Sequence, residues 1–124
     1  MDPLLRQEVR KRAGYRCEYC HLRQDQEPLP FHVEHITPRQ HGGGDKLENL
    51  ALACHHCNLH KGPNLAGLEP ESGKLTRLFH PRLDHWIEHF SIDNGEVHGL
   101  SAIGRTTASL LRMNAGGRAR LREG

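Results

Sequence analysis

The sequence predicts one small α+β domain, with a helix at its N-terminal end and a hairpin followed by a helix at its C-terminal end. Three observations support this fold class. The chain has 124 residues, which suits a single compact domain. Segments with the helical spacing of apolar residues lie between short segments of β-type alternation. Four cysteines occur as two closely spaced pairs, which is typical of a metal-binding framework.

The core is expected to be thin, because apolar residues make up 35% and aromatic residues only 5% of the chain. Small domains with thin cores usually need a disulfide or a metal for stability. The longest apolar run, residues 50–54, is too short for a transmembrane helix, and the N-terminus is too charged for a secretory signal. We therefore expect a cytoplasmic protein in a reducing compartment, where disulfides are disfavoured.

The charged residues are unevenly distributed, although the formal net charge is only +2. Residues 1–16 contain five lysines and arginines against two acids, and residues 105–124 contain five against one. The segment between them is acidic. Basic ends can hold phosphate groups, but they are equally typical of solvated helix faces, and both interpretations remain open.

The N-terminal half begins with a predicted helix over residues 3–13. Proline suits the first turn of a helix, Leu5 and Val9 share one face, and Gly14 suits the end of the helix. The elements expected next are a cysteine turn at 17–20, a loop at 21–30, a strand at 31–36, a glycine-rich loop at 40–45, a helical turn and strand at 47–53, and a second cysteine turn leading into a helix at 54–61.

The C-terminal half carries a hairpin signal, because Asn94-Gly95 separates two short segments of β-type alternation. Apolar residues on one helical face predict a helix over residues 105–113. The remaining segments are a connector at 64–82, a short amphipathic piece at 85–90, and a basic tail at 118–124 that is either a short helix or disordered.

The four cysteines form two Cys-x2-Cys pairs, Cys17 with Cys20 and Cys54 with Cys57. A two-residue spacer lets both sulfurs of a turn point at one ion, and two such turns complete a tetrahedral zinc site. Zinc binding can contribute roughly 10–16 kcal/mol, which matches a whole domain's stability of about 5–15 kcal/mol. Four thiolates leave no open coordination position, so this zinc is expected to be structural. A redox dithiol and unrelated buried thiols are the alternatives.

Several short motifs lie between and just after the cysteine pairs. They are Glu34-His35-Ile36-Thr37-Pro38, Gly42-Gly43-Gly44, Asn49-Leu50 and Asn58-x2-Lys61-Gly62. In this order and spacing, residues 17–62 resemble the HNH nuclease motif, a ββα-metal (His-Me finger) fold framed by two Cys-x2-Cys turns. Residues 12–20 and 78–82 also resemble small bacterial HNH proteins. The resemblance implies a single HNH nuclease domain over residues 1–124, with its motif core at 17–62 and a C-terminal extension at 63–124.

The resemblance implies a role for each of four residues. Glu34 on the strand and Asn58 on the helix are expected to hold a catalytic Mg²⁺ or Mn²⁺, ions that prefer oxygen ligands. Asn58 stands where the family most often has a histidine. His35 matches the general base that accepts a proton from the attacking water. Asn49 matches a residue that braces the loop and orients His35. Taken alone, Asn49 is also an ordinary turn residue and Asn58 an ordinary helix cap.

The resemblance further implies a metal-dependent endonuclease that hydrolyses phosphodiester bonds in DNA, expected to be double-stranded, with no membrane partner. Lys61, Arg39 and Arg105 are the expected contacts to the nucleic acid. Other candidates for phosphate contacts are Arg6, Arg10, Arg12, Arg112, Arg118, Arg120 and Arg122. No sequence-specific DNA-binding module is visible, so a weak sequence preference is expected.

Two other functions remain open at this point. One is a non-catalytic, zinc-stabilised nucleic-acid-binding module that has kept the fold, and the other is a zinc-stapled adaptor between proteins. His32 and His60 are additional candidates for the catalytic metal site, because each lies two residues from an expected ligand. The oligomeric state is left open.

Overall fold

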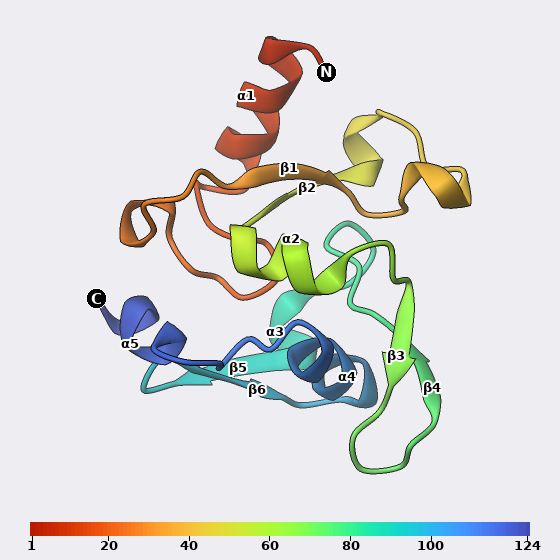
Figure 1. Cartoon of the computed structure of the whole chain (residues 1–124), viewed down its shortest axis with the longest axis vertical. Coiled ribbons are helices and arrows are strands. Elements are labelled where there is room, and N and C mark those ends of the chain that lie inside the picture. Colours follow the sequence, from red (N-terminus) through yellow and green to blue (C-terminus); the bar gives the residue numbers. More distant parts are fainter.

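The computed structural model describes all 124 residues, with five α-helices and six strands paired as three antiparallel ribbons (Figure 1). The helices are α1 (Pro3–Arg12), α2 (His55–Lys61), α3 (Trp86–His89), α4 (Ala102–Leu110) and α5 (Arg118–Glu123). The strands are β1 (His32–His35), β2 (Leu50–Ala53), β3 (Ala66–Leu68), β4 (Leu75–Arg77), β5 (Phe90–Asp93) and β6 (Glu96–Gly99). The predicted α+β class is confirmed.

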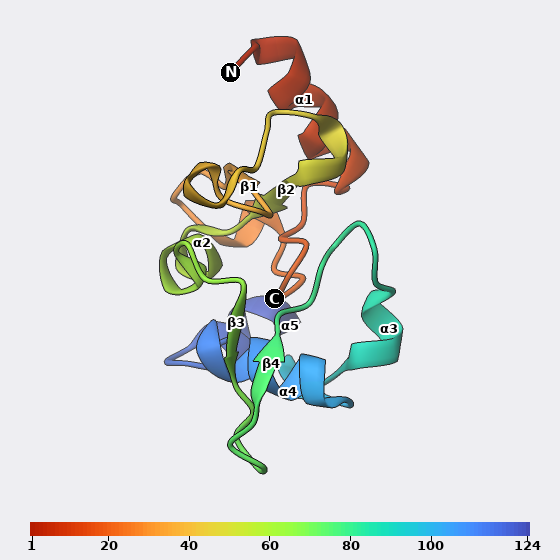
Figure 2. The ribbon, with the colours of Figure 1, turned by 90° about the vertical axis from the view of Figure 1, so that its right-hand side faces the viewer.

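The elements are stacked along the long axis of the molecule (Figures 1 and 2). Helix α1 lies at one end against the β1–β2 ribbon, α2 lies beneath that ribbon, and β5, β6 and α4 follow below α2. One hydrophobic cluster of 18 buried residues runs through these parts and includes all four cysteines. No helix has both the length and the apolar character needed to cross a membrane.

Helix α1 confirms the prediction for residues 3–13 to within one residue. The Asp2 carboxylate caps it by accepting a hydrogen bond from the Leu4 amide at 2.9 Å, and Val9 is fully buried. At its other end, Arg12 donates to the carbonyls of Leu47 and Leu50 at 3.0 and 2.5 Å. Arg12 therefore connects α1 to the start of β2 and to the 3₁₀ turn before it, and its guanidinium is already hydrogen-bonded.

Strands β1 and β2 and helix α2 form the predicted strand–strand–helix unit. Glu34 pairs with Ala51, and His35 pairs with Leu50, in the antiparallel register. All four residues of β2 are buried, so this strand packs against the protein interior. A one-turn 3₁₀ helix, Leu47–Asn49, precedes β2, in agreement with the predicted helical turn and strand.

The C-terminal half contains the predicted hairpin and helix, but the helix spans residues 102–110 rather than 105–113. The turn residues Asn94 and Gly95 both have positive φ, +51° and +78°, as a two-residue hairpin turn requires. Helix α4 begins at residue 102 rather than 105, because the Ser101 hydroxyl accepts from the Gly104 amide at 3.0 Å and caps the helix there.

Two other C-terminal segments gain structure that the sequence left undefined. The expected connector at 64–82 contains the β3–β4 ribbon, in which Leu68 pairs with Leu75. Both leucines are largely exposed, at 68% and 76%, so no burial pattern marks these three-residue strands. The basic tail forms α5 rather than a disordered end.

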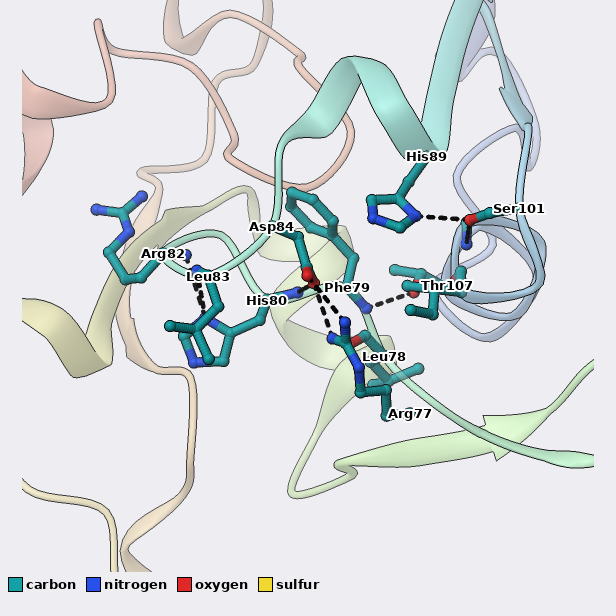
Figure 3. A network of polar contacts seen from close by, with 12 residues as sticks. Arg77, Leu78, Phe79, His80, Arg82, Leu83, Asp84, His89, Ser101 and Thr107 are labelled. Atoms are coloured by element: carbon teal, nitrogen blue, oxygen red, sulfur yellow. Dashed lines mark hydrogen bonds and ion pairs between the residues drawn. The ribbon is translucent and has the colours of Figure 1, made fainter.

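The loop between β4 and α3 is anchored by Asp84 (Figure 3). Its carboxylate accepts two hydrogen bonds of 2.8 Å from the Arg77 guanidinium and one of 2.8 Å from the His80 amide. The Phe79 amide donates to the Thr107 hydroxyl on α4 at 2.8 Å. The loop is therefore fastened within itself by Asp84 and to the C-terminal helix layer by Thr107.

Replacing Asp84 with asparagine is expected to lower the free energy of unfolding at pH 7. Chiefly through the bonds from Arg77, the pKa of Asp84 falls from 3.8 to about 2. This shift corresponds to roughly 2 kcal/mol. Because the folded-state pKa is the lower one, the stabilisation is present above pH 3.8 and is lost as the pH falls through about 2.

Urea unfolding of the wild type and Asp84→Asn at several pH values measures this contribution. The difference between the two proteins should be largest near neutral pH and should close in acid. Asp25→Asn is the matched control, because Asp25 is paired with Arg23 but its side chain is 71% exposed, so little change is expected. An equal loss of unfolding free energy in both variants would contradict the assignment of this stabilisation to the Arg77–Asp84 contact.

Candidate functional site

The four cysteine sulfurs converge on one point inside the protein. All four residues are buried, and their sulfurs lie within 4.8 Å of one another. The Cys20 and Cys54 sulfurs are 3.8 Å apart. Tetrahedral zinc with bonds of about 2.3 Å places its sulfur ligands at about this separation. The residues present therefore fit a structural zinc ion, as the sequence predicts.

In both cysteine turns, a backbone amide is directed at the sulfur of a cysteine in the candidate metal site. The Cys20 amide points at the Cys17 sulfur at 3.4 Å, and the Cys57 amide points at the Cys54 sulfur at 3.3 Å. Such N–H groups stabilise thiolates. Burial raises the pKa of the Cys17 thiol, and a divalent ion offsets that cost of ionisation. The second turn also begins α2, with Cys54 as its cap, so a zinc ion ties α2 to the N-terminal turn.

A cavity of about 340 Å³ is lined by residues of the strand–strand–helix unit and does not include the four cysteines. It brings together three residues predicted from the sequence, Glu34 and His35 at the end of β1 and Asn58 on α2. Its other lining residues are His32, Val33, Pro38, Arg39, Gly62 and Pro63.

Glu34 occupies the inner wall of this cavity and is only 8% exposed. Its Oε2 lies 4.0 Å from the Lys61 ammonium, and its Oε1 is buried without any hydrogen-bond partner. Burial raises the pKa of Glu34, while the Lys61 ammonium and the Tyr19 hydroxyl act in the opposite direction. A buried carboxylate oxygen without a partner is costly in a folded protein. Together with the neighbouring Asn58 amide, it fits a divalent cation.

His35 is held by a residue that the sequence did not single out. Its Nε2 lies 2.6 Å from Asp45 Oδ1, and the Arg39 guanidinium donates to both Asp45 oxygens at 3.0 and 3.2 Å. The hydrogen bond with His35 is the main cause that lowers the pKa of Asp45, so this carboxylate is an acceptor at neutral pH. His35 Nε2 is therefore the donor in this hydrogen bond, and Nδ1 is the ring nitrogen that is not engaged by Asp45.

Asn49 braces the loop that carries Asp45 and does not touch the His35 side chain. Its Oδ1 accepts from the Thr37 amide at 2.8 Å, and its Nδ2 donates to the carbonyls of Thr37 and Gly44 at 3.0 and 2.8 Å. A Cβ on Gly43 would lie 1.7 Å from the Thr37 carbonyl oxygen, so only glycine allows this close approach. Asn49 thus positions Asp45 through the loop backbone.

The three expected nucleic-acid contacts have different surroundings. Arg39 is 67% exposed at the cavity, where a phosphate can reach it. Lys61 is only 2% exposed and donates to the Ile36 carbonyl at 3.0 Å, so its ammonium faces inward. Arg105 forms ion pairs with Glu69 at 3.1 Å and Glu71 at 2.6 Å, which offset its charge. Arg39 is also paired, with Asp45, but it is the most exposed of the three and the one that lines the cavity, so the geometry favours Arg39.

The two additional histidine candidates, His32 and His60, differ in their position relative to the cavity. His32 lines the cavity, and its Nε2 lies 3.1 Å from His55 Nδ1. His60 does not line the cavity, and its ring lies 4.3 Å from the ring of His56.

Asp45 is the functional residue that sequence reasoning missed. It is the last residue of the predicted glycine-rich loop at 40–45 and directly follows the three glycines. A single acid ten positions after a histidine carries no signal by itself. The contact depends on the loop folding back over the end of β1, which the Asn49 bonds secure.

Comparison with known proteins gives one result that bears on these two sites. The model of the HNH endonuclease family matches residues 17–64. This range begins at the first zinc-site cysteine and includes the cavity residues on β1 and α2. Neither the curated proteins nor the solved structures include a match to the chain.

Proposed function

We propose, from the membership of residues 17–64 in the HNH endonuclease family, that this protein is a metal-dependent endonuclease that hydrolyses phosphodiester bonds in DNA. The observation that carries the proposal is the unpartnered, buried Oε1 of Glu34 beside His35 and Asn58 in one cavity. A purely structural carboxylate would have its hydrogen-bonding capacity satisfied.

Glu34 and Asn58 are the residues proposed to hold the catalytic cation, Mg²⁺ or Mn²⁺. When bound, such an ion stabilises negative charge on the phosphate and on the leaving oxygen. The open cavity leaves room for a phosphate group next to these two side chains. The zinc-site cysteines lie outside that cavity and are all buried, so their role is structural.

His35 is proposed as the general base. Because Nε2 donates to Asp45, the free lone pair on Nδ1 can accept a proton from a water molecule that attacks the phosphorus. Asp45 keeps the ring in the required tautomer and orientation, and Asn49 supports the Asp45 loop. These three residues therefore act in series, and only His35 handles the proton.

Arg39 is the proposed phosphate contact at the mouth of the cavity. It is exposed, and Asp45, which also contacts the proposed base His35, forms an ion pair with it. We propose double-stranded DNA as the substrate and the reducing cytoplasm, which suits four thiolates, as the place of action. A single cavity addresses one strand at a time, so nicks are the first expected product.

The decisive assay is cleavage of supercoiled plasmid by the zinc-loaded protein with and without Mg²⁺ or Mn²⁺. Cleavage should require the added ion, and His35→Ala should lower the rate by about 100-fold or more, since a positioned base contributes at least that much. His41→Ala is the matched control, because His41 is exposed on the adjacent loop and lies outside the cavity.

Two results would contradict the proposal. Unchanged cleavage in His35→Ala would refute the assigned base. DNA binding without any metal-dependent cleavage would instead support the non-catalytic nucleic-acid-binding module.

Asp45→Asn tests the positioning of the base. We expect kcat to fall about 10- to 100-fold, the usual cost of removing a partner that orients a functional group, while KM stays nearly constant. Asp45→Glu retains a carboxylate, which can only accept a hydrogen bond, and should recover part of the rate. An equal change in KM would indicate that Asp45 serves DNA binding through Arg39, and Arg39→Ala measures that contribution separately.

A further inference from the structure

The C-terminal helix α5 lies close to the cysteine site. A Cβ on Gly95 would lie 1.9 Å from the Ala119 carbonyl oxygen, so the α5 backbone rests directly on the β5–β6 turn. Leu121 packs against the buried core from the same helix. Figure 1 shows α5 at the end of the β5–β6 ribbon, beside the loop that follows the first cysteine turn.

Arg118 contacts a cysteine sulfur directly. Its Nη2 donates to Cys54 Sγ at 3.2 Å, and its Nη1 lies 4.0 Å from Glu27 Oε2. Only 11% of the Arg118 side chain is exposed. A buried guanidinium in this position makes a charge-assisted hydrogen bond to a thiolate, which is stronger than a bond between neutral groups.

Arg122 holds the other cysteine turn. Its Nε donates to the Cys20 carbonyl at 2.8 Å, and its Nη1 donates to the Gly95 carbonyl at 2.8 Å. It also donates to the Met113 carbonyl. One turn of α5 therefore places one arginine on each cysteine pair, Arg118 on the second pair and Arg122 on the first.

Arg120 lies between Arg118 and Arg122 in the sequence but has different surroundings. It is exposed and its side chain makes no hydrogen bond or ion pair within the protein. The arginine row 118, 120 and 122 is thus divided by the fold. Two members face the metal site, and one faces solvent, so the row is not a single phosphate-binding surface.

We propose that α5 is part of the zinc centre, and that Arg118 and Arg122 retain the metal. Four thiolates around a divalent ion keep a net negative charge, which is costly to bury. The Arg118 guanidinium at the Cys54 sulfur and the Arg122 guanidinium at the Cys20 backbone bring positive charge to the site, which offsets that negative charge in the low-dielectric interior. The helix also covers the site, so a competing chelator reaches the sulfurs only when α5 lifts away.

The experiment measures zinc release from the full-length, zinc-loaded chain to the chromophoric chelator 4-(2-pyridylazo)resorcinol. Arg118→Gln should release zinc about tenfold faster or more, because hydrogen bonds to charged groups are the strong ones. Arg122→Gln should also release it faster. Arg120→Gln should behave as the wild type and is the matched control on the same helix.

A second control separates charge from simple loosening of the helix. Leu121→Ala weakens the packing of α5 without removing a guanidinium, so it should accelerate release less than Arg118→Gln at a comparable loss of Tm. If Arg118→Gln does not fold, Arg118→Lys and Arg122→Gln decide the question.

Release at the wild-type rate in the arginine variants, or release no faster than in Leu121→Ala, would overturn the proposal. A wild-type chain that carries no zinc would also overturn it. None of these measurements depends on DNA cleavage, so their outcome is independent of the proposed nuclease activity.

Discussion

The convergence of four cysteine sulfurs is the constraint on which the rest of the molecule depends. The two cysteine turns are separated by 33 residues in the sequence, and that intervening segment contains β1, the Asp45 loop and β2. Because the second turn also begins α2, joining the two turns sets α2 against the β1–β2 ribbon. The cavity between β1 and α2 exists only as long as that arrangement holds. In a core with few aromatic residues, a zinc ion is the strongest single interaction available to hold it.

Around the cysteine site, some polar side chains are used in contacts within the protein, whereas others are left without a partner. Arg12, Arg118 and Arg122 donate to backbone carbonyls or to a cysteine sulfur, and Lys61 is buried against Glu34. Three arginines of the basic ends are therefore used in contacts within the protein. By contrast, Glu34 Oε1 is left without a partner inside the cavity. Three other buried side-chain atoms also lack a partner, on Tyr19, Arg105 and Arg118, but none of these residues lines the cavity.

The sequence predicted the parts of the structure that depend on local or paired signals. The cysteine spacing, the Asn94-Gly95 turn and the periodicity of α1 are of this kind, and each has the expected geometry. The missing parts depend on contacts between segments that are distant along the chain. The Asp45 contact to His35 requires the loop bonds of Asn49, and the Arg118 contact to Cys54 spans 64 positions. The β3–β4 ribbon escaped prediction because its paired leucines are both exposed.

The central claim is that Glu34 and Asn58 hold a divalent cation beside His35. Diffraction from crystals of the zinc-loaded protein soaked in Mn²⁺, recorded on both sides of the manganese absorption edge, tests this most directly. We expect a manganese anomalous peak between the Glu34 carboxylate and the Asn58 amide, separate from the zinc peak at the four cysteines. Anomalous density confined to the cysteine site, with Glu34 Oε1 still unpartnered in the presence of Mn²⁺, would contradict it.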